Sequence, residues 1–341
     1  MDLIGTLLAM VELGWCAGFV IRTRENNLVF DPDSTHGLAR DSSVFISHAH
    51  ADHSAGFRSR LVKYSTVETR EIFESIHGRG VVNFHDVKLH CPIRLGDAEI
   101  TPLNAGHMLG STQFLVTLPN TTILYTGDIN CLDTLTTTRA ERAECDTLVV
   151  EATYGEPSYI FPEREQTYAK IVSWALDQIK QGLAPTFQAY GAGKAQELVK
   201  LFNVYTKLDV ITDQKIAGIN AVYSNNGLKM FSRTAAAEEP NNDDSVLIAT
   251  RPYFLSDSRK YVKAVTTGWA LKMSPKRAAA FPLSSHADYR QILQFVKDSK
   301  AKTVYGFTGY TDVLATQIRK ELGIQSRPLP MLAQKTLHHF R

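Results

Sequence analysis

One short stretch of the chain concentrates side chains that can hold a metal ion: His48, His50, Asp52 and His53. It directly follows an apolar run at residues 44–46, which is typical of the end of a buried strand. Because His48 and His50 lie two positions apart, an extended backbone points both rings to the same side. Neutral imidazole nitrogen and carboxylate oxygen hold catalytic zinc and similar transition metals. A chance cluster of surface histidines is the alternative, but the chain has only 11 His in 341 residues, so we interpret the stretch as a metal site.

Three further candidates each follow an expected strand. His107 comes after a strand at residues 99–103 and lies among glycines, which allow a close approach of the backbone. Asp128 ends the strand at residues 122–126, where its carboxylate could bridge two metals. Asp31 also ends a strand, and we expect it to hydrogen-bond a ligand histidine from behind. Each of them also fits an ordinary loop or turn, but their order after the histidine cluster favours one shared metal site.

The elements that must position these residues form two groups along the chain. Up to about residue 150 the pattern is rich in strands, which we expect at residues 11–13, 18–21, 27–30, 81–84, 99–103, 113–117, 122–126 and 146–151. One helix is expected directly after the histidine cluster and another at residues 66–77. From Pro157 onward helices and strands alternate, which is typical of a small α/β unit. Here helices are expected at residues 163–180, 194–205, 284–300 and 312–322, and strands at 185–189 and 303–307. The last strand and helix are expected to rejoin the first sheet.

Composition sets wide bounds on the rest. A length of 341 residues allows one large or two moderate domains, and 44% hydrophobic with 21% charged residues is ordinary for a globular protein. The net charge of +2 neither requires nor excludes a nucleic-acid partner. The 4 cysteines are scattered, which favours a reducing compartment, so we expect a cytoplasmic protein. Residues 1–20 are fairly apolar, but Asp2 and Glu12 interrupt them, so neither a secretory signal nor a membrane span is expected.

The ligand candidates occur in an order that resembles the metallo-β-lactamase fold: His48, His50, Asp52 and His53, then His107, then Asp128. This resemblance implies an α/β fold, an αββα sandwich with its metals at the rim. By the same resemblance, one set of residues would hold a first metal: His48, His50, His107 and Asp128. Asp52, His53 and the shared Asp128 would hold a second.

Two later motifs resemble the β-CASP nuclease branch of that fold, one around Glu151 and one around His286. In that branch a second, smaller α/β domain is inserted into the sandwich. The resemblance implies a first sandwich part at residues 1–157, the insert at 158–265 and a completing part at 266–341. It also implies that Glu151 pairs with His286, keeping the imidazole cationic so that it acts as a general acid or stabilises the leaving oxygen. Asp52, Glu151 and His286 are therefore the candidate catalytic residues.

Three other stretches look like the bacterial DNA ligase-associated exonucleases: residues 189–196, 267–270 and 309–311. The chain departs from the RNA-processing members of the branch at Thr308, where they carry a histidine ligand for the second metal. Threonine is a poor zinc ligand, so we expect one or two zinc ions, with the second site weak. Residues 191–194 superficially resemble a P-loop but lack its first glycine and its final hydroxyl residue. We interpret them as a strand-to-helix turn whose amides and Lys194 could contact a substrate phosphate.

These features favour a zinc-dependent nuclease that acts on DNA, with exonuclease character and a repair role. Its expected partners are a nucleic-acid substrate and a DNA ligase or other repair proteins. An RNA nuclease of the 3′-end processing type is the alternative on the same scaffold. A non-catalytic nucleic-acid-binding relative is a third hypothesis, for which Thr308 is the only hint. A small-molecule hydrolase is disfavoured, because neither the apparent insert nor the pair of Glu151 and His286 is needed for small substrates.

Overall fold

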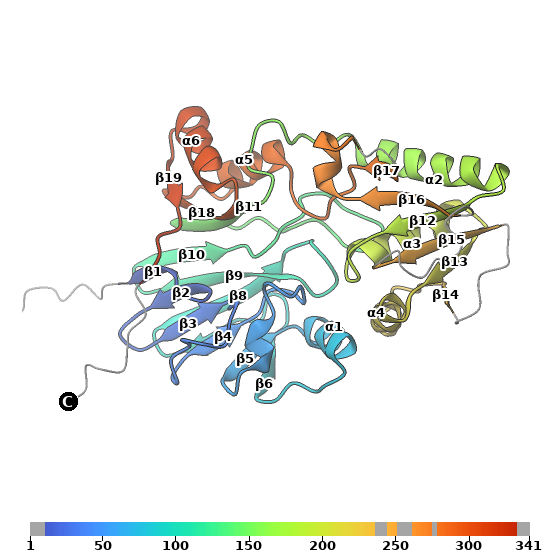
Figure 1. Ribbon diagram of the computed structural model, residues 1–341. Helices are drawn as coiled ribbons and strands as arrows, with labels where there is room; N and C mark the ends of the chain where they lie inside the picture. Colours follow the sequence, from blue (N-terminus) through green and yellow to red (C-terminus); the bar gives the residue numbers. More distant parts are fainter. Residues whose placement is uncertain (1–10, 236–243, 251–260, 275–277, 333–341) are drawn as a thin grey trace, which may run out of the picture.

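A computed structural model describes residues 11–235, 244–250, 261–274 and 278–332, which form three sheets and their covering helices (Figure 1). The first sheet has the order β1-β2-β3-β4-β5-β6. Its strands are β1 Glu12–Trp15, β2 Phe19–Arg22, β3 Asn27–Phe30, β4 Ser43–Phe45, β5 Val62–Ser65 and β6 Phe84–Asp86. The short helix η1 (Ala55–Arg58) follows the histidine cluster, and α1 (Val67–His77) covers the outer face of this sheet.

The second sheet packs on the first and contains strands from both ends of the chain, in the order β19-β18-β11-β10-β9-β8-β7. Its strands are β7 Ile93–Leu95, β8 Ala98–Asn104, β9 Thr112–Leu118, β10 Thr121–Tyr125, β11 Thr147–Ala152, β18 Thr303–Gly309 and β19 Gln325–Pro328. Helices α5 (Tyr289–Asp298) and α6 (Thr311–Leu322) cover its outer face. Because β18 pairs in parallel with β11, the segment after residue 300 rejoins the sheet, as the sequence predicts.

The order of layers follows from the central strands, whose successive apolar side chains face two different cores. Within β11, Val149 faces the core between the two sheets, while Leu148 and Val150 face the core under α5 and α6. Phe114 on β9 also belongs to the core between the sheets, and Phe73 of α1 packs over the opposite face of the first sheet. Successive strand side chains point to opposite faces, so a central strand must be apolar on both. The result is the αββα sandwich that the resemblance implies.

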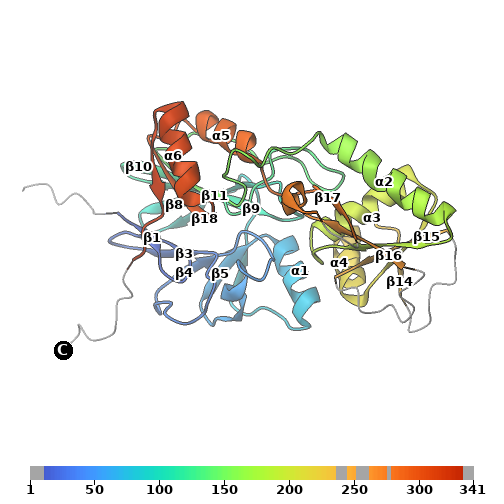
Figure 2. The same ribbon diagram turned by 45° about the horizontal axis from the view of Figure 1, so that its top comes forward.

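The third sheet lies beside the sandwich and is parallel throughout, in the order β14-β13-β15-β12-β16-β17 (Figure 2). Its strands are β12 Ala184–Gln188, β13 Asp209–Thr212, β14 Arg233–Thr234, β15 Ser245–Ala249, β16 Tyr261–Thr266 and β17 Ala278–Phe281. Its helices are α2 Arg164–Lys180, α3 Lys194–Tyr205, α4 Gln214–Asn225 and the short η3 Gly268–Lys272. Helices α1 and α4 lie side by side, where Asn226 donates a hydrogen bond to Glu71 over 3.0 Å.

Two details differ from the sequence-based expectations. Helix α5 begins at Tyr289 and not at residue 284, because Asp288 caps it: its carboxylate accepts from the Gln291 amide. The third sheet also runs past residue 265, the expected end of the insert, since β16 spans that position and β17 ends at Phe281. We propose that the inserted unit extends to that strand. Among the described residues, no helix is long and apolar enough to cross a membrane.

We expect Phe114→Ala to lower the free energy of unfolding by about 3–5 kcal/mol, because the ring is fully buried between the sheets against Phe30 and Phe45. Val204→Ala is the control, since Val204 is 53% exposed and its truncation should change stability by less than about 0.5 kcal/mol. Urea denaturation followed by circular dichroism measures both. Equal losses for the two variants would contradict the assigned core.

Candidate metal centre

The candidate ligands meet where the two sheets of the sandwich join. The histidine cluster occupies the loop that leaves β4, while His107 lies between β8 and β9 and Asp128 lies just after β10. The amide of Thr112 in the second sheet donates to the carbonyl of Ser47 beside the cluster, over 2.9 Å. Gly106 has φ +71° and sits so close to residues 130–140 that a Cβ would lie 2.6 Å from a backbone nitrogen. Only glycine therefore lets the His107 loop take this path, as its glycine-rich sequence suggests.

Four donor atoms converge on one point. His50 Nδ1 lies 3.1 Å from both His48 Nε2 and His107 Nε2. The Oδ2 atom of Asp128 lies 3.4 Å from His48 Nε2 and 3.7 Å from His107 Nε2. Ligands about 2.0–2.1 Å from a tetrahedral zinc ion lie roughly 3.3–3.4 Å from one another. The spacing of these four atoms therefore matches the edges of a tetrahedral coordination site.

Backbone carbonyls fix the proton position on two of the three rings. His50 donates from Nε2 to the carbonyl of Ala192 over 3.2 Å, so its Nδ1 carries a lone pair. His107 donates from Nδ1 to the carbonyl of Ser285 over 2.7 Å, which leaves a lone pair on Nε2. A carbonyl can only accept, so these tautomers follow from the neighbours of each ring. In both rings the nitrogen without a proton is the one that faces the other donors.

Asp31 fixes the proton position on His48, through Ser47, and on His53 directly. The Ser47 hydroxyl donates to Asp31 over 2.5 Å and is thereby left to accept from His48 Nδ1, which lies 2.9 Å away. His53 Nδ1 donates directly to Asp31 over 2.8 Å. The Ser47 amide and the Tyr125 hydroxyl also donate to this buried carboxylate, over 2.6 and 3.0 Å. Asp31 thus sets both tautomers from outside the ring of donors, which is the position expected from its place at the end of β3.

The arrangement fits a cation on chemical grounds. Burial lowers the pKa of His48 and His107 well below its ordinary value and that of His50 to about 4, so these rings are neutral at neutral pH. Burial also raises the pKa of Asp128 to about 6, despite the nearby His53. Three lone pairs and a carboxylate that face one another repel unless a positive charge lies between them. The residues present therefore suit a transition metal such as zinc.

A second position lies beside the first. His53 Nε2 is 3.6 Å from Asp128 Oδ1 and 3.7 Å from Asp52 Oδ2. Burial disfavours a charged His53, but Asp128, Asp31 and Asp52 outweigh burial and raise its pKa to about 10. The carboxylates thus favour a positive charge at this point, whether it comes from a proton or from a metal. The two oxygens of Asp128 face different positions, as a bridging carboxylate requires.

Thr308 does not add a donor to the second position. It is the extra residue of a β-bulge in β18, at the register shift opposite Glu151 and Ala152, and its φ of +54° is uncommon for a β-branched residue. Its side chain is exposed, and its hydroxyl donates to the carbonyl of Phe307 over 2.7 Å. The hydroxyl is therefore already engaged with its own strand.

Glu151 and His286 lie together on the far side of Asp128. His286 Nδ1 is 3.0 and 3.1 Å from the two oxygens of Glu151, which also accepts from the Ile129 amide over 2.7 Å. Burial lowers the pKa of His286, but Glu151 and Asp128 outweigh it and raise the pKa above its ordinary value. The imidazole is thus held towards its cationic form, with Nε2–H left to face a substrate.

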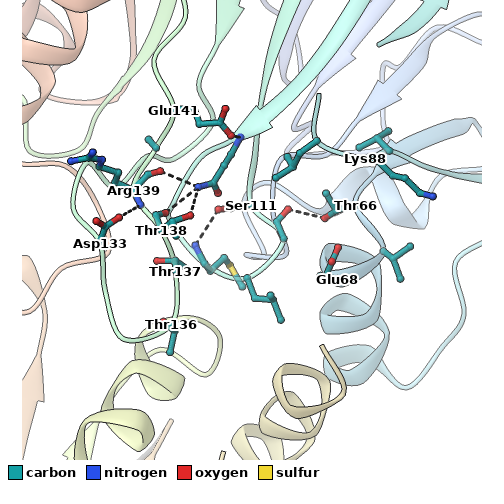
Figure 3. Close-up of a pocket in the computed structure, with 18 of the residues that line it drawn as sticks. Thr66, Glu68, Lys88, Ser111, Asp133, Thr136, Thr137, Thr138, Arg139 and Glu141 are labelled. Atoms are coloured by element: carbon teal, nitrogen blue, oxygen red, sulfur yellow. Dashed lines mark hydrogen bonds between the residues drawn. The ribbon is translucent and has the colours of Figure 1, made fainter. Parts of the chain in front are cut away.

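A groove beside the loop that carries His107 is a separate feature. It has a volume of about 1060 Å³ and lies on the other side of the His107 loop, between the start of α1 and the loop at residues 133–142 (Figure 3). Its charged walls carry both signs: Lys88, Arg139 and Arg142 against Glu68, Asp86, Asp133 and Glu141. Walls of mixed charge do not attract a polyanion, and none of the converging donors lines the groove. We therefore place the chemistry at the donors and not in this groove.

The structure brings all the sequence-derived candidates into one region, and it adds partners that the sequence did not reveal. The carbonyls of Ala192 and Ser285 are the clearest cases, because every residue has a carbonyl and no side-chain type marks one. Tyr125 carried a weak signal, as a hydroxyl that directly follows the apolar residues Ile123 and Leu124 at the end of its strand.

We expect Asp31→Asn to weaken metal binding by about 10- to 100-fold, because the amide cannot accept from all the donors that set the histidine tautomers. Asp33→Asn, on an exposed carboxylate two residues away, is the matched control. Metal titration with a competing chelator measures both. Unchanged affinity in Asp31→Asn would contradict an orienting role.

Parts of the chain are similar to known proteins. Residues 17–178 match the family model described as "Beta-lactamase superfamily domain". A probable DNA ligase of Opitutus terrae is 26% identical over 83% of this chain and 30% of its own length. An RNase J-like protein of Methanocaldococcus jannaschii is 28% identical over 53% of this chain and 49% of its own length. This chain therefore spans half or less of these relatives.

Two further matches add to the comparison. Cleavage and polyadenylation specificity factor subunit 3 of Dictyostelium discoideum is 27% identical over 48% of this chain and 25% of its own length. A crystal structure of a protein of unknown function from Enterococcus faecalis V583 shares the fold, with a TM-score of 0.65, 15% identity and coverage of 95% of this chain and 96% of that chain. With the sandwich and its donors, these matches confirm the resemblance to the metallo-β-lactamase fold for residues 17–178, and the relatives named as RNase J-like and as cleavage factor subunit are in keeping with the β-CASP branch.

Proposed function

We propose that the chain is a zinc-dependent nuclease that hydrolyses phosphodiester bonds in DNA, with exonuclease character and a role in repair. One observation supports this most: the converging donors lie next to the ion pair of Glu151 and His286. A metal site alone would suit many hydrolases. A cationic imidazole beside it adds a proton donor for a leaving oxygen, which phosphodiester hydrolysis uses.

The side chains divide the work in this proposal. His48, His50, His107 and Asp128 hold the first ion, and a zinc ion bound there would supply Lewis acidity and hydroxide at neutral pH. Asp52, His53 and Asp128 hold a second ion more weakly, because only three side chains face that position. His286 donates its Nε2 proton to the leaving oxygen while Glu151 accepts from the other ring nitrogen, Nδ1.

We favour DNA over RNA as the substrate because the relatives named as DNA ligases match a larger share of this chain than the relatives named as RNases. The two relatives named as DNA ligases, from Opitutus terrae and Arabidopsis thaliana, match 83% and 84% of this chain. The relatives named as RNases from Methanocaldococcus jannaschii match 53% and 48%. The match to the Opitutus ligase takes up 30% of that protein, so the similar region is one part of a longer ligase. We therefore propose a DNA ligase as a partner and the cytoplasm as the compartment.

The substrate test is direct competition. We expect the purified chain, supplied with Zn²⁺, to shorten 5′- or 3′-labelled DNA from one end in the presence of equimolar RNA of the same sequence. Product ladders on a denaturing gel report polarity and mode. Preferential cleavage of the RNA would favour the 3′-end processing alternative. Binding without cleavage under Zn²⁺, Mn²⁺ and Mg²⁺ would favour the non-catalytic relative.

We expect His286→Asn to lower kcat by about 10²- to 10⁴-fold, because the proton donor is lost. His90→Asn, on an exposed imidazole, is the control and should leave kcat unchanged.

In the unmodified protein the rate should fall as pH rises through the raised pKa of His286, since the cationic form is the active one. Glu151→Gln removes the charge that raises this pKa, so the alkaline limb should move to lower pH. A limb that stays in place in Glu151→Gln would rule out His286 as its origin.

A further inference from the structure

Lys194 is a buried cation at the first position of helix α3, with 5% of its surface exposed. Among the residues that the structure describes, no carboxylate or carbonyl oxygen lies within hydrogen-bond or ion-pair distance of its Nζ atom. The ammonium lies over the Tyr190 ring, 5.0 Å from its centroid. The Nζ atom itself still reaches solvent, so this cation, which no anion neutralises, is open to a negatively charged ligand.

The nearest carboxylate is already engaged. Glu197, one helical turn along α3, accepts hydrogen bonds from both Arg164 and Tyr168. The Arg164 guanidinium also donates to the carbonyl of Ser284 over 2.6 Å. Glu197 is therefore neutralised by an arginine that lies closer to it than Lys194 does. Burial lowers the pKa of Lys194 to about 8, against the opposing charge of Glu197, so the amine stays mostly protonated at neutral pH.

The turn that carries Lys194 lies directly against the candidate metal centre. The carbonyl of Ala192 is the one that orients His50. Gly193 has φ +82°, and a Cβ there would lie 3.2 Å from the side chain of Met108, next to His107. The Tyr190 ring is 6.2 Å from the His50 ring and is 63% exposed. The positive charge of Lys194 lowers the pKa of His286, against the larger effects of Glu151 and Asp128, so the two cations lie near each other.

The ammonium, and not the helix amides, is the group available to an anion. The amide of Gly193 donates to the Gln196 side chain over 2.8 Å, and the amide of Ala195 donates to the carbonyl of Tyr190 over 3.2 Å. These first-turn donors are used within the turn. The positive end of the helix dipole still adds to the charge of Lys194.

We propose that Lys194 binds a non-bridging oxygen of the substrate phosphate that neighbours the scissile phosphodiester. This deepens the proposed function and rests on it. In the proposed function the metal position and His286 contact the reacting phosphate. Lys194, which lies beside them at the start of α3, would then contact the next phosphate along the strand.

The test pairs a charge removed from the protein with a charge removed from the strand. Single-stranded oligonucleotides carry one neutral methylphosphonate, moved one position at a time past the scissile bond. Dissociation constants are measured by fluorescence anisotropy with Zn²⁺ in the His286→Asn background, where cleavage is slow. We expect Lys194→Met to weaken binding of the unmodified strand by about 10-fold or more, and to lower the salt slope by about 0.7. Lys200→Met, on the same helix but bonded to the carbonyl of Lys229, is the control and should change binding less than 2-fold.

The decisive result is the pattern of the methylphosphonate series. In the protein with Lys194, a methylphosphonate at one phosphate next to the scissile bond should weaken binding by about 10-fold. In Lys194→Met this loss of affinity should vanish, while the loss caused by a methylphosphonate at the scissile phosphate remains. If the methylphosphonate at each position weakens binding equally in the protein with Lys194 and in Lys194→Met, then Lys194 does not contact a phosphate. The nuclease proposal would still stand. If the protein with His286 intact neither binds nor cleaves DNA or RNA, the proposed function fails and the phosphate contact fails with it. The wild-type series also reports on the contact if Lys194→Met proves unstable.

Discussion

The convergence of electron-rich atoms at one point is the constraint on which the rest of the site depends. His48, His50 and His107 each present an unprotonated nitrogen to the others and to Asp128. Left to themselves, neutral imidazoles would turn so that one ring donates to the next. They cannot do so here, because each proton is already held on the outer nitrogen by a carbonyl or by the Ser47 hydroxyl. The outer hydrogen bonds thus preorganise the site for a cation.

These outer acceptors come from distant parts of the chain, so the site depends on the whole architecture. Asp31 comes from the first sheet, Ala192 from the third and Ser285 from the segment that returns to the second. The inserted unit is therefore more than an attachment beside the sandwich. One of its carbonyls, that of Ala192, orients a candidate ligand, and the same turn carries Lys194. Movement of this unit would change both at once.

Much of this could be predicted from the sequence, for identifiable physical reasons. His48 and His50 follow a buried strand, although they lie in the loop after β4 and not on an extended strand, and Asp128 and His107 stand after the ends of strands. The two-sheet sandwich was expected from the resemblance of the ligand motifs, and the strand order agrees with it. The cap at Asp288 was missed because the polar residues before it can also start a helix. The later end that we propose for the insert rests on β17, a short strand of small residues that resembles a connecting segment in the sequence but pairs with β16.

The pairing of β11 with β18 has a consequence for how the site forms. Thr147 pairs with Thr303 across the whole inserted unit, so this contact closes a very long loop and must form late in folding. Ser285 and His286 lie on the same returning segment. A chain that is still being synthesised therefore lacks the acceptor for His107 and the partner of Glu151 until the segment with Ser285 and His286 has left the ribosome. The candidate centre stays incomplete until that segment has returned to the sandwich.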